Sequence, residues 1–367
     1  MGLNDAERIA LLNLLAVPGI GAWGAIRLVK ELNLPSKVFG AGDGVLRSVP
    51  RIADKAIEAI HKASPTGEAG RKQFTAASEC GARLISYWDE EYPPILKELE
   101  QDAPAVLFVK GNLQADARRI AFVGTRRASD YGKRACKELI GGLSGSGIHV
   151  VSGLASGIDG AAHQTALERN ILTEAVFGCG IDIIYPESHK ALSDKILEQG
   201  GALISEYAPG LQPSAYTFPQ RNRIIAGLSL ATIVIEAPGK SGALITARLA
   251  ASYSRDVGAI PGFIVGGKAA GCHELIKEGA ALIDSPQDIL DLVKMSTRAA
   301  ELRPAPAPNL AEAEKKLWDI IPGADKIHID LLAEKAGQGT GEVLSRLLLM
   351  ELKGFIKQLP GKYFVRA

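Results

Sequence analysis

The chain has 367 residues, of which 47% are apolar, so it is long enough for two or three domains with sizeable cores. Its formal net charge of +1 excludes a uniformly basic protein that coats nucleic acid, and a nucleic-acid surface must therefore be a local patch. No apolar stretch reaches about 18 residues, so no transmembrane helix is expected, and four scattered cysteines without a CxxC pair argue against a disulfide framework or zinc site and predict a cytoplasmic location.

The first predicted domain, residues 1–65, consists of short helical segments. Met1–Glu7 has no basic region, which argues against a secretory signal. Leu15–Leu28 matches the hairpin of a helix-hairpin-helix unit, in which glycines let the backbone approach a DNA phosphate. A second half at Val49–Ala53 lacks both glycines. Two interpretations stay open: direct DNA contact, or a small helical domain for packing or protein interaction.

The second predicted domain, residues 66–298, alternates short apolar strands with helices. This pattern is typical of a parallel sheet covered on both faces and predicts an α/β fold. In such sheets ligands bind at the carboxyl ends of the strands, so the loops after the strands are the candidate functional segments. The predicted strands are Arg119–Val123, Ile148–Val151, Leu172–Phe177, Ala202–Ser205, Ala231–Ile235, Val257–Ile260 and Ala281–Ile283. The predicted helices include Tyr131–Leu143, Gly160–Arg169, His189–Gln199, Ala243–Ser254 and His273–Glu278.

The first strand continues into Gly124, Thr125 and Arg126. A dinucleotide-binding loop needs a small glycine where Arg126 stands, and no acidic residue follows the next strand at the ribose position, so no NAD cofactor is expected. Arginine at the carboxyl end of a strand suits a phosphate, because its planar fork donates two hydrogen bonds. The alternative is that Arg126 pairs with a carboxylate elsewhere in the fold.

The second strand continues into a glycine-rich turn that contains Ser152, Gly153, Ala155, Gly157 and Asp159. Glycine permits a turn in which successive N–H groups point to one place, and the following helix adds partial positive charge. The turn is therefore a candidate phosphate cradle, with Asp159 capping the helix or orienting a donor. An ordinary tight strand-to-helix turn is the alternative.

A third motif, residues 217–229, is predicted to be a loop that places Arg221 and Arg223 near successive phosphates, with Asn222 between them. Phe218 supplies a ring on which a base can stack, which is how single strands are bound without reading their sequence. A solvated pair of arginines is the alternative.

A fourth motif follows the strand that ends at Glu236 and contains Lys240, Ser241 and Gly242 at the start of a helix. It lacks the spacing of a Walker loop but resembles a short anion-binding nest. Because the motifs follow strands of one sheet, they are expected to converge into a single basic pocket.

The C-terminal part begins with a predicted proline-rich linker at 299–309, where alternating prolines favour an extended conformation. Residues 310–367 are predicted to form a winged helix. The start of its third helix is poorly basic, so weak duplex binding and protein interaction both stay open. The predicted elements are helices Ala311–Ile320, His328–Ala336 and Gly341–Lys353 and the hairpin Gly354–Arg366.

The motifs VGTRRAS, VVSGLASGIDGAAH, FPQRNRIIAGLS and EAPGKSGALITA, in this order, resemble the DprA/Smf family. The resemblance extends from about Tyr92 to about Val293. It implies an extended Rossmann-like domain that binds single-stranded DNA, with an N-terminal SAM-like (helix-hairpin-helix) domain and a C-terminal winged helix. It also implies a cytoplasmic homodimer that loads the RecA recombinase in transformation and recombination, with single-strand-binding protein as a further partner and no membrane contact.

The resemblance also implies which residues bind DNA, and two segments depart from the family pattern. Phe263–Ala270 lacks the usual polar run, and Gln212–Tyr216 has no counterpart of a family lysine. The expected DNA-binding residues are Gly124, Thr125, Arg126, Ser152, Gly153, Ala155, Gly157, Phe218, Arg221, Asn222, Arg223, Lys240, Ser241 and Gly242.

Two other functions compete with a non-enzymatic DNA binder. A related group of nucleotide phosphohydrolases, the lysine-decarboxylase-like enzymes, carries PGGxGTxxE. This chain has Lys240, Ala243 and Thr246 at its second glycine, threonine and glutamate. The usual carboxylate is therefore missing, and the remaining acid–base candidates are Asp159, His163, Glu206 and Glu236. The other alternative is a regulator that reads duplex DNA through the winged helix.

Overall fold

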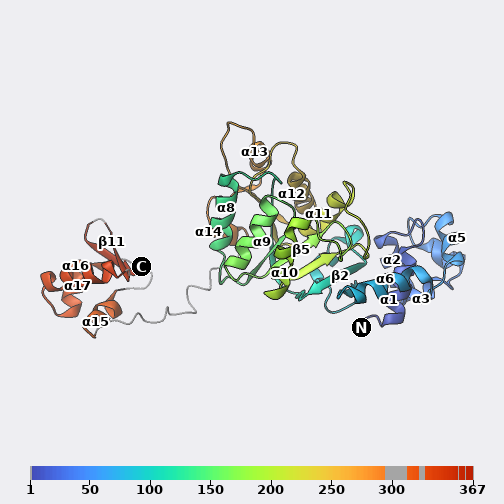
Figure 1. Ribbon diagram of the computed structural model, residues 1–367, viewed down its shortest axis with the longest axis horizontal. Coiled ribbons are helices and arrows are strands. Elements are labelled where there is room, and N and C mark those ends of the chain that lie inside the picture. The colour runs from blue at the N-terminus through green and yellow to red at the C-terminus, as the bar shows by residue number, and fades with distance from the viewer. Residues whose placement is uncertain (1, 294–311, 322–326, 354, 360, 367) are drawn as a thin grey trace. The chain divides into compact units, whose positions relative to one another are not determined.

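The structure is a computed structural model that describes residues 2–293, 312–321, 327–353, 355–359 and 361–366. The chain forms two compact units, Met1–Thr297 and Arg298–Ala367, and each is described by itself (Figure 1). The predicted linker at 299–309 lies outside the described residues.

A nine-stranded sheet forms the centre of the first unit. All predicted strands are present and pair in parallel with one another, which confirms the predicted α/β class. Two strands that the sequence does not single out, β1 and β2, extend the sheet: β2 pairs antiparallel with β6, and β1 pairs antiparallel with β2. The sheet order is β1-β2-β6-β5-β4-β3-β7-β8-β9. The strands are β1 Arg83–Ser86, β2 Val106–Gly111, β3 Arg118–Val123, β4 Ile148–Ser152, β5 Thr173–Phe177, β6 Ala202–Ser205, β7 Ala231–Val234, β8 Asp256–Ala259 and β9 Ala281–Leu282.

The strand order changes direction beside β3. The chain adds β4, β5 and β6 on one side of β3, and then crosses to add β7, β8 and β9 on the other side. The loops after β3 and β7 consequently leave in different directions, which opens a crevice above the carboxyl ends of these strands. Ligands of open α/β sheets bind at this kind of switch point.

Helices cover both faces of the sheet, because successive side chains of a buried strand point to opposite faces. Ile120 and Phe122 of β3 share a core with helices α8, α9 and α14, whereas Ala121 and Val123 share a core with α11, α12 and α13. The helices of this region are α7 Pro94–Lys97, α8 Asp130–Gly141, α9 Ile158–Glu168, α10 Lys190–Glu198, α11 Thr217–Leu228, α12 Gly242–Ser252, α13 Ala270–Lys277 and α14 Pro286–Leu292, with 3-10 turns at Glu100–Asp102 and Glu187–His189.

The N-terminal segment is helical, as the sequence predicts, and continues as one compact unit with the sheet. Its hairpins repeat one backbone geometry: Gly19 has φ +85° between the first pair of helices, and Arg51 has φ +66° at the matching place in the second pair. The buried Asn13 joins this region to the chain that leads into the sheet, since its amide bonds Gly67 and Gly70. The helices are α1 Asp5–Leu15, α2 Ala22–Leu32, α3 Pro35–Val38, α4 Asp43–Ser48, α5 Asp54–Lys62 and α6 Glu68–Glu79.

The second unit contains the three predicted helices and the predicted hairpin around its own apolar core. A short additional strand makes the hairpin part of a three-stranded sheet with the order β10-β12-β11. In the described parts of both units, every helix is too short or too polar to cross a bilayer. The elements are α15 Glu312–Ile320, β10 Ile327–His328, α16 Ile329–Ala336, α17 Thr340–Leu352, β11 Ile356–Leu359 and β12 Tyr363–Arg366.

Candidate functional site

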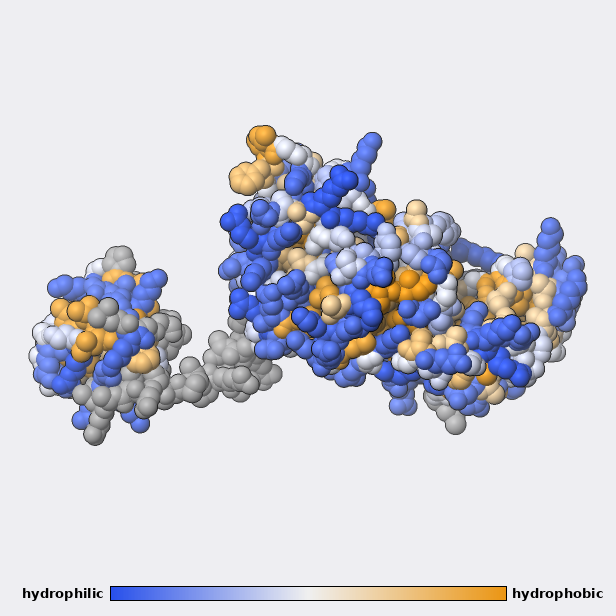
Figure 2. Space-filling view, viewed as in Figure 1, coloured by the Kyte–Doolittle hydropathy of each residue, from blue (hydrophilic) through white to orange (hydrophobic). Residues whose placement is uncertain are grey.

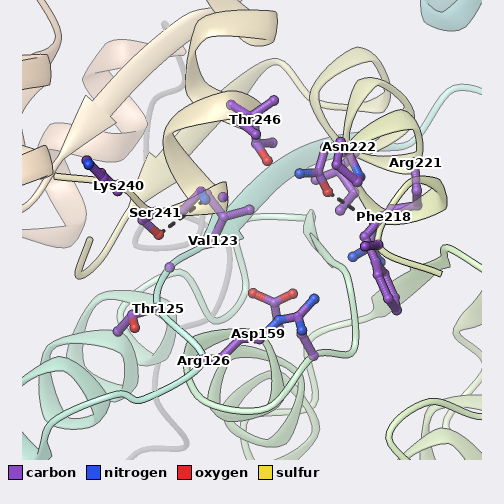
Figure 3. A pocket seen from close by; sticks show the side chains of 18 of the residues that line it. Val123, Thr125, Arg126, Asp159, Phe218, Arg221, Asn222, Lys240, Ser241 and Thr246 are labelled. Carbon is purple, nitrogen blue, oxygen red and sulfur yellow. Dashed lines mark hydrogen bonds between the residues drawn. The ribbon is translucent and has the colours of Figure 1, made fainter. Parts of the chain in front are cut away.

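A hollow of about 620 Å³ lies above the carboxyl ends of β3, β4 and β7, at the switch point of the sheet. We call it the carboxyl-edge hollow. Segments from all four predicted motifs line it, so the expected convergence into one pocket is observed (Figure 3). Ser152, Gly153, Gly157 and Arg223 do not line it. The expected residues that do are Gly124, Thr125, Arg126, Ala155, Phe218, Arg221, Asn222, Lys240, Ser241 and Gly242.

The loop after β3 has a fixed backbone and two exposed cations, Arg126 and Arg127, of which Arg126 lines the hollow. The N–H of Thr125 donates to the carbonyl of Glu236 at 2.7 Å, and its carbonyl accepts from Ile158 at 3.2 Å. Gly124 has no room for a side chain, because a Cβ would lie 2.5 Å from Ile158. Arg126 is exposed, stacks over the ring of Phe218 at 5.0 Å and pairs with no carboxylate in the part of the chain that the structure describes. The alternative of an Arg126 ion pair is therefore not observed, and its guanidinium is available to a ligand.

The turn after β4 is internally bonded rather than open. Ser152 is buried and donates to the carbonyl of Phe122 at 2.6 Å, and the N–H of Gly153 donates to Asp159 at 3.2 Å. Gly157 has φ +83° and packs against the first loop, where a Cβ would meet the Thr125 carbonyl. These contacts match the alternative of a tight strand-to-helix turn. The N–H of Gly153 already donates to Asp159 and is therefore not free to bind a phosphate.

The third motif is a helix, α11, and the prediction of a loop is wrong. Successive residues of a helix are rotated by about 100°, so positions two apart point in nearly opposite directions. Arg221 points into the sheet, whereas Arg223 points away and pairs with Glu206 at 2.5 Å. The two arginines therefore do not lie side by side, and Arg223 lies outside the carboxyl-edge hollow.

Arg221 is a buried clamp between strands. Only 4% of it is exposed, and its Nη1 donates to the carbonyls of Gly153 at 2.7 Å and of Val176. Burial lowers the pKa of the guanidinium, although the nearby Asp159 acts in the opposite direction. Burial likewise raises the pKa of the Asp159 carboxyl, against the positive charge of Arg221. Arg221 thus holds α11 to the ends of β4 and β5.

Aromatic rings form one wall of the hollow. The half-buried ring of Phe218 lies 5.4 Å from the ring of Tyr185, and Arg126 and Arg221 lie over the same Phe218 ring. The sequence reasoning did not identify Tyr185, which is 45% exposed and lines the hollow. The signal in the sequence that could have identified Tyr185 is that it is an aromatic residue in the segment that follows β5. The two rings are tilted by 39° to each other, so the wall offers aromatic faces to a planar group.

The opposite wall carries a helix N-terminus and a lysine. Ser241 caps α12 by accepting from the N–H of Ala243 at 3.3 Å, and Gly242 is the first residue of the helix. Lys240 is exposed and has no ion-pair partner among the residues described. Figure 3 shows Lys240 and Phe218 on opposite sides of the hollow. A helix N-terminus beside a free lysine favours an anion such as phosphate.

The acid–base candidates are already engaged in the fold. His163 is fully buried: its Nδ1 lies 2.7 Å from Thr173 Oγ1, its Nε2 has no hydrogen-bond partner among the described residues, and burial lowers its pKa to about 3. Glu206 pairs with Arg223, and the Glu236 carboxylate accepts from Ser129. Within the described ranges no cluster of His, Cys, Asp and Glu suits a metal ion.

Two family descriptions match the chain. Residues 83–294 match "DNA recombination-mediator protein A", and residues 301–362 match "DprA winged helix domain". The second match confirms the predicted winged helix. A relative from Escherichia coli, Protein Smf, is 40% identical over 286 residues, which cover 76% of each chain.

The solved structures that are similar to this one include two of DNA processing protein A. The X-ray structure of DNA processing protein A from Streptococcus pneumoniae has a TM-score of 0.67 and 36% identity, and the match covers 79% of this chain and 98% of that one. It confirms the extended Rossmann-like sheet. A structure of DNA processing protein A from Helicobacter pylori concerns the single-stranded DNA binding mode of that protein. Its TM-score is 0.52 and its identity 28%, over 59% of this chain and 97% of that one.

Proposed function

The chain belongs to the family of DNA recombination-mediator protein A, and we propose that it binds single-stranded DNA in the carboxyl-edge hollow. The observation that carries the proposal is Arg126, an exposed guanidinium without a carboxylate partner among the described residues, which lies over the Phe218 ring at 5.0 Å. The Helicobacter pylori relative, described as a single-stranded DNA binder, supports the assignment.

The two walls of the hollow suit the two parts of a nucleotide. Arg126 and Lys240 bind phosphates, and the N-terminus of α12 adds partial positive charge beside Lys240. The rings of Phe218 and Tyr185 stack on bases. A base reaches these rings only when it is not paired and stacked in a duplex, so the site prefers single strands and reads little sequence.

The biological role that we propose is recombination mediation without catalysis. A homodimer holds incoming or exposed single strands in the cytoplasm and loads RecA onto them, in exchange with single-strand-binding protein. The recombination-mediator family supports this role. The engagement of His163, Glu206 and Glu236 within the fold favours a binder over a nucleotide hydrolase.

The test is to titrate a labelled oligonucleotide, single-stranded and duplex, with wild type and with Arg126→Ala at several salt concentrations. Wild type is expected to prefer the single strand. Arg126→Ala should bind it about tenfold more weakly, because a charged hydrogen bond is lost, and with a salt dependence flatter by about 0.7 in log–log slope. Arg134→Ala is the matched control, since Arg134 is exposed on α8 outside the hollow.

The same variants test the proposed role. Wild type should accelerate assembly of RecA on strands coated with single-strand-binding protein, whereas Arg126→Ala should not at equal concentration. If Arg126→Ala and Arg134→Ala bind DNA equally well, the hollow is not the DNA site. Light scattering of the full chain measures the proposed dimer independently.

A further inference from the structure

The loop after β8 exposes three consecutive large apolar residues, which we call the apolar tip. Phe263, Ile264 and Val265 are 75%, 88% and 84% exposed. Figure 2 shows an apolar projection in the region of α13, where this loop lies in Figure 1. Isolated exposed apolar residues are common on proteins, but a consecutive run in water is unfavourable and indicates a contact surface.

The base of the tip is held firmly. The hydroxyl of Tyr131 donates to the carbonyl of Pro261 at 2.7 Å, and the Tyr131 ring contacts Phe263 edge-to-face at 5.8 Å. On the other side, Nε2 of His273 lies 3.1 Å from the carbonyl of Gly262. These contacts fix the backbone of Pro261 and Gly262, from which the apolar tip projects.

A second cavity, the apolar slot, lies beneath this loop and has a volume of about 370 Å³. Volumes of about 300–1,000 Å³ are usual for sites that take small planar ligands, so the slot can take a nucleobase but not a folded segment. Its lining carries one cation, Lys268, and two carboxylates, the exposed Asp130 and the buried Glu236. Its apolar lining comes from Ile235, Ile260, Tyr131, Phe263 and Val265.

The slot and the carboxyl-edge hollow share a wall at the end of β7. The carbonyl of Glu236 accepts from Thr125 in the hollow, and its carboxylate accepts from Ser129 at the slot. The next residue, Ala237, accepts from Gly271 of α13 at 2.8 Å. The slot and the hollow are therefore neighbours across the end of β7.

We propose that the apolar slot and tip bind an unstacked base of the same single strand whose phosphates lie in the carboxyl-edge hollow. The inference rests on the proposed function. The rings of Tyr131 and Phe263 provide stacking surfaces. Two carboxylates, Asp130 and Glu236, beside the single cation Lys268 suit a neutral base that can donate hydrogen bonds, and they disfavour a phosphate or an anionic membrane.

The experiment compares the full-length wild type with a triple variant, Phe263→Ser, Ile264→Ser and Val265→Ser. The matched control is Leu348→Ser with Leu349→Ser, which removes leucines that are 56% and 53% exposed on α17. The probes are oligothymidylates of increasing length and the same lengths built from tetrahydrofuran spacers, which keep the phosphates and lack bases. Binding is measured at several salt concentrations.

The triple variant is expected to bind long oligothymidylate about tenfold more weakly, which is the range for one stacked base, and to bind the spacer strand as wild type does. Its salt slope should be unchanged because no charge is removed. In a second measurement, Phe263→Trp should keep the affinity, and its added fluorescence should be quenched by oligothymidylate and not by the spacer strand.

Equal losses on both probes, or no loss on either, overturn the inference. If the triple variant instead loses only binding to phosphatidylglycerol vesicles or only self-association in light scattering, the tip serves a membrane or a second copy. Failure of the proposed function is distinct: wild type would not bind oligothymidylate, or Arg126→Ala would bind it normally.

Discussion

Charged side chains are buried and paired at the amino ends of the central strands, whereas cations are exposed at their carboxyl ends. At the amino ends of β3, β4 and β5, Arg119, His149 and Glu174 are buried together, with Arg119 Nε 2.6 Å and His149 Nδ1 3.0 Å from the Glu174 carboxylate. At the carboxyl ends, Arg126 and Lys240 are exposed and unpaired among the described residues. The comparison separates cations that hold the fold together from cations that are available to a ligand.

Arg221 shows that the position of a cation in the sheet does not by itself decide whether it stabilises the fold or is available to a ligand. It lies at the carboxyl ends with Arg126, yet it is buried and bonded to two strand-end carbonyls, as Arg119 is bonded to Glu174 and to the carbonyl of Ala117. What matters is whether the fold already satisfies the guanidinium. A satisfied arginine stabilises the protein, and an unsatisfied one is left for phosphate.

The largest expected effect comes from breaking the amino-end cluster. Glu174→Ala leaves Arg119 buried without its carboxylate, so the free energy of unfolding of the first unit should fall by about 3–5 kcal/mol. Denaturant unfolding measures it. Glu168→Ala is the control, because its pair with Lys137 is exposed and is worth about 0–1 kcal/mol. Equal losses in the two variants would mean that the buried cluster does not hold the sheet.

The second prediction tests whether Arg221 stabilises the fold or binds a phosphate. Arg221→Ala leaves two buried carbonyls without a donor and removes the cation beside the buried Asp159, so unfolding free energy should fall by about 2–3 kcal/mol. The salt slope of DNA binding by the folded protein should not change. Unchanged stability with a slope flatter by about 0.7 would instead identify Arg221 as a phosphate ligand.

The sequence predicts the part of this comparison that depends on local pattern. Short apolar strands, the glycine-rich turns and the winged helix each have a local signature, and the structure has these elements close to their predicted bounds. Pairing between segments that are distant in the sequence cannot be predicted from local pattern. The antiparallel edge of β1 and β2 depends on pairing with distant β6, which has no local signal.

The candidate site was predictable by segment but not by side chain. The prediction of a loop at residues 217–229 is wrong because it rests on Pro219 and the four polar residues that follow Phe218, although proline is tolerated in the first turn of a helix. Arg126 and Arg221 are the same residue type in neighbouring motifs. Only the folded chain shows that one is exposed and the other buried.

The smallest expected effect on stability comes from Lys240→Ala, which should weaken DNA binding and leave the fold unchanged. It therefore separates the two classes of cation most clearly. Lys240→Ala removes an exposed cation that makes no ion pair with the described residues, so unfolding free energy should change by less than about 0.5 kcal/mol. Single-strand affinity should fall several-fold at low salt, with a log–log salt slope flatter by about 0.7, since one phosphate contact is lost. Lys277→Ala, exposed on α13 outside the hollow, should change neither quantity. If both lysine variants flatten the slope equally, the carboxyl ends attract DNA through diffuse charge, and the distinction between satisfied and available cations would not explain where the strand binds.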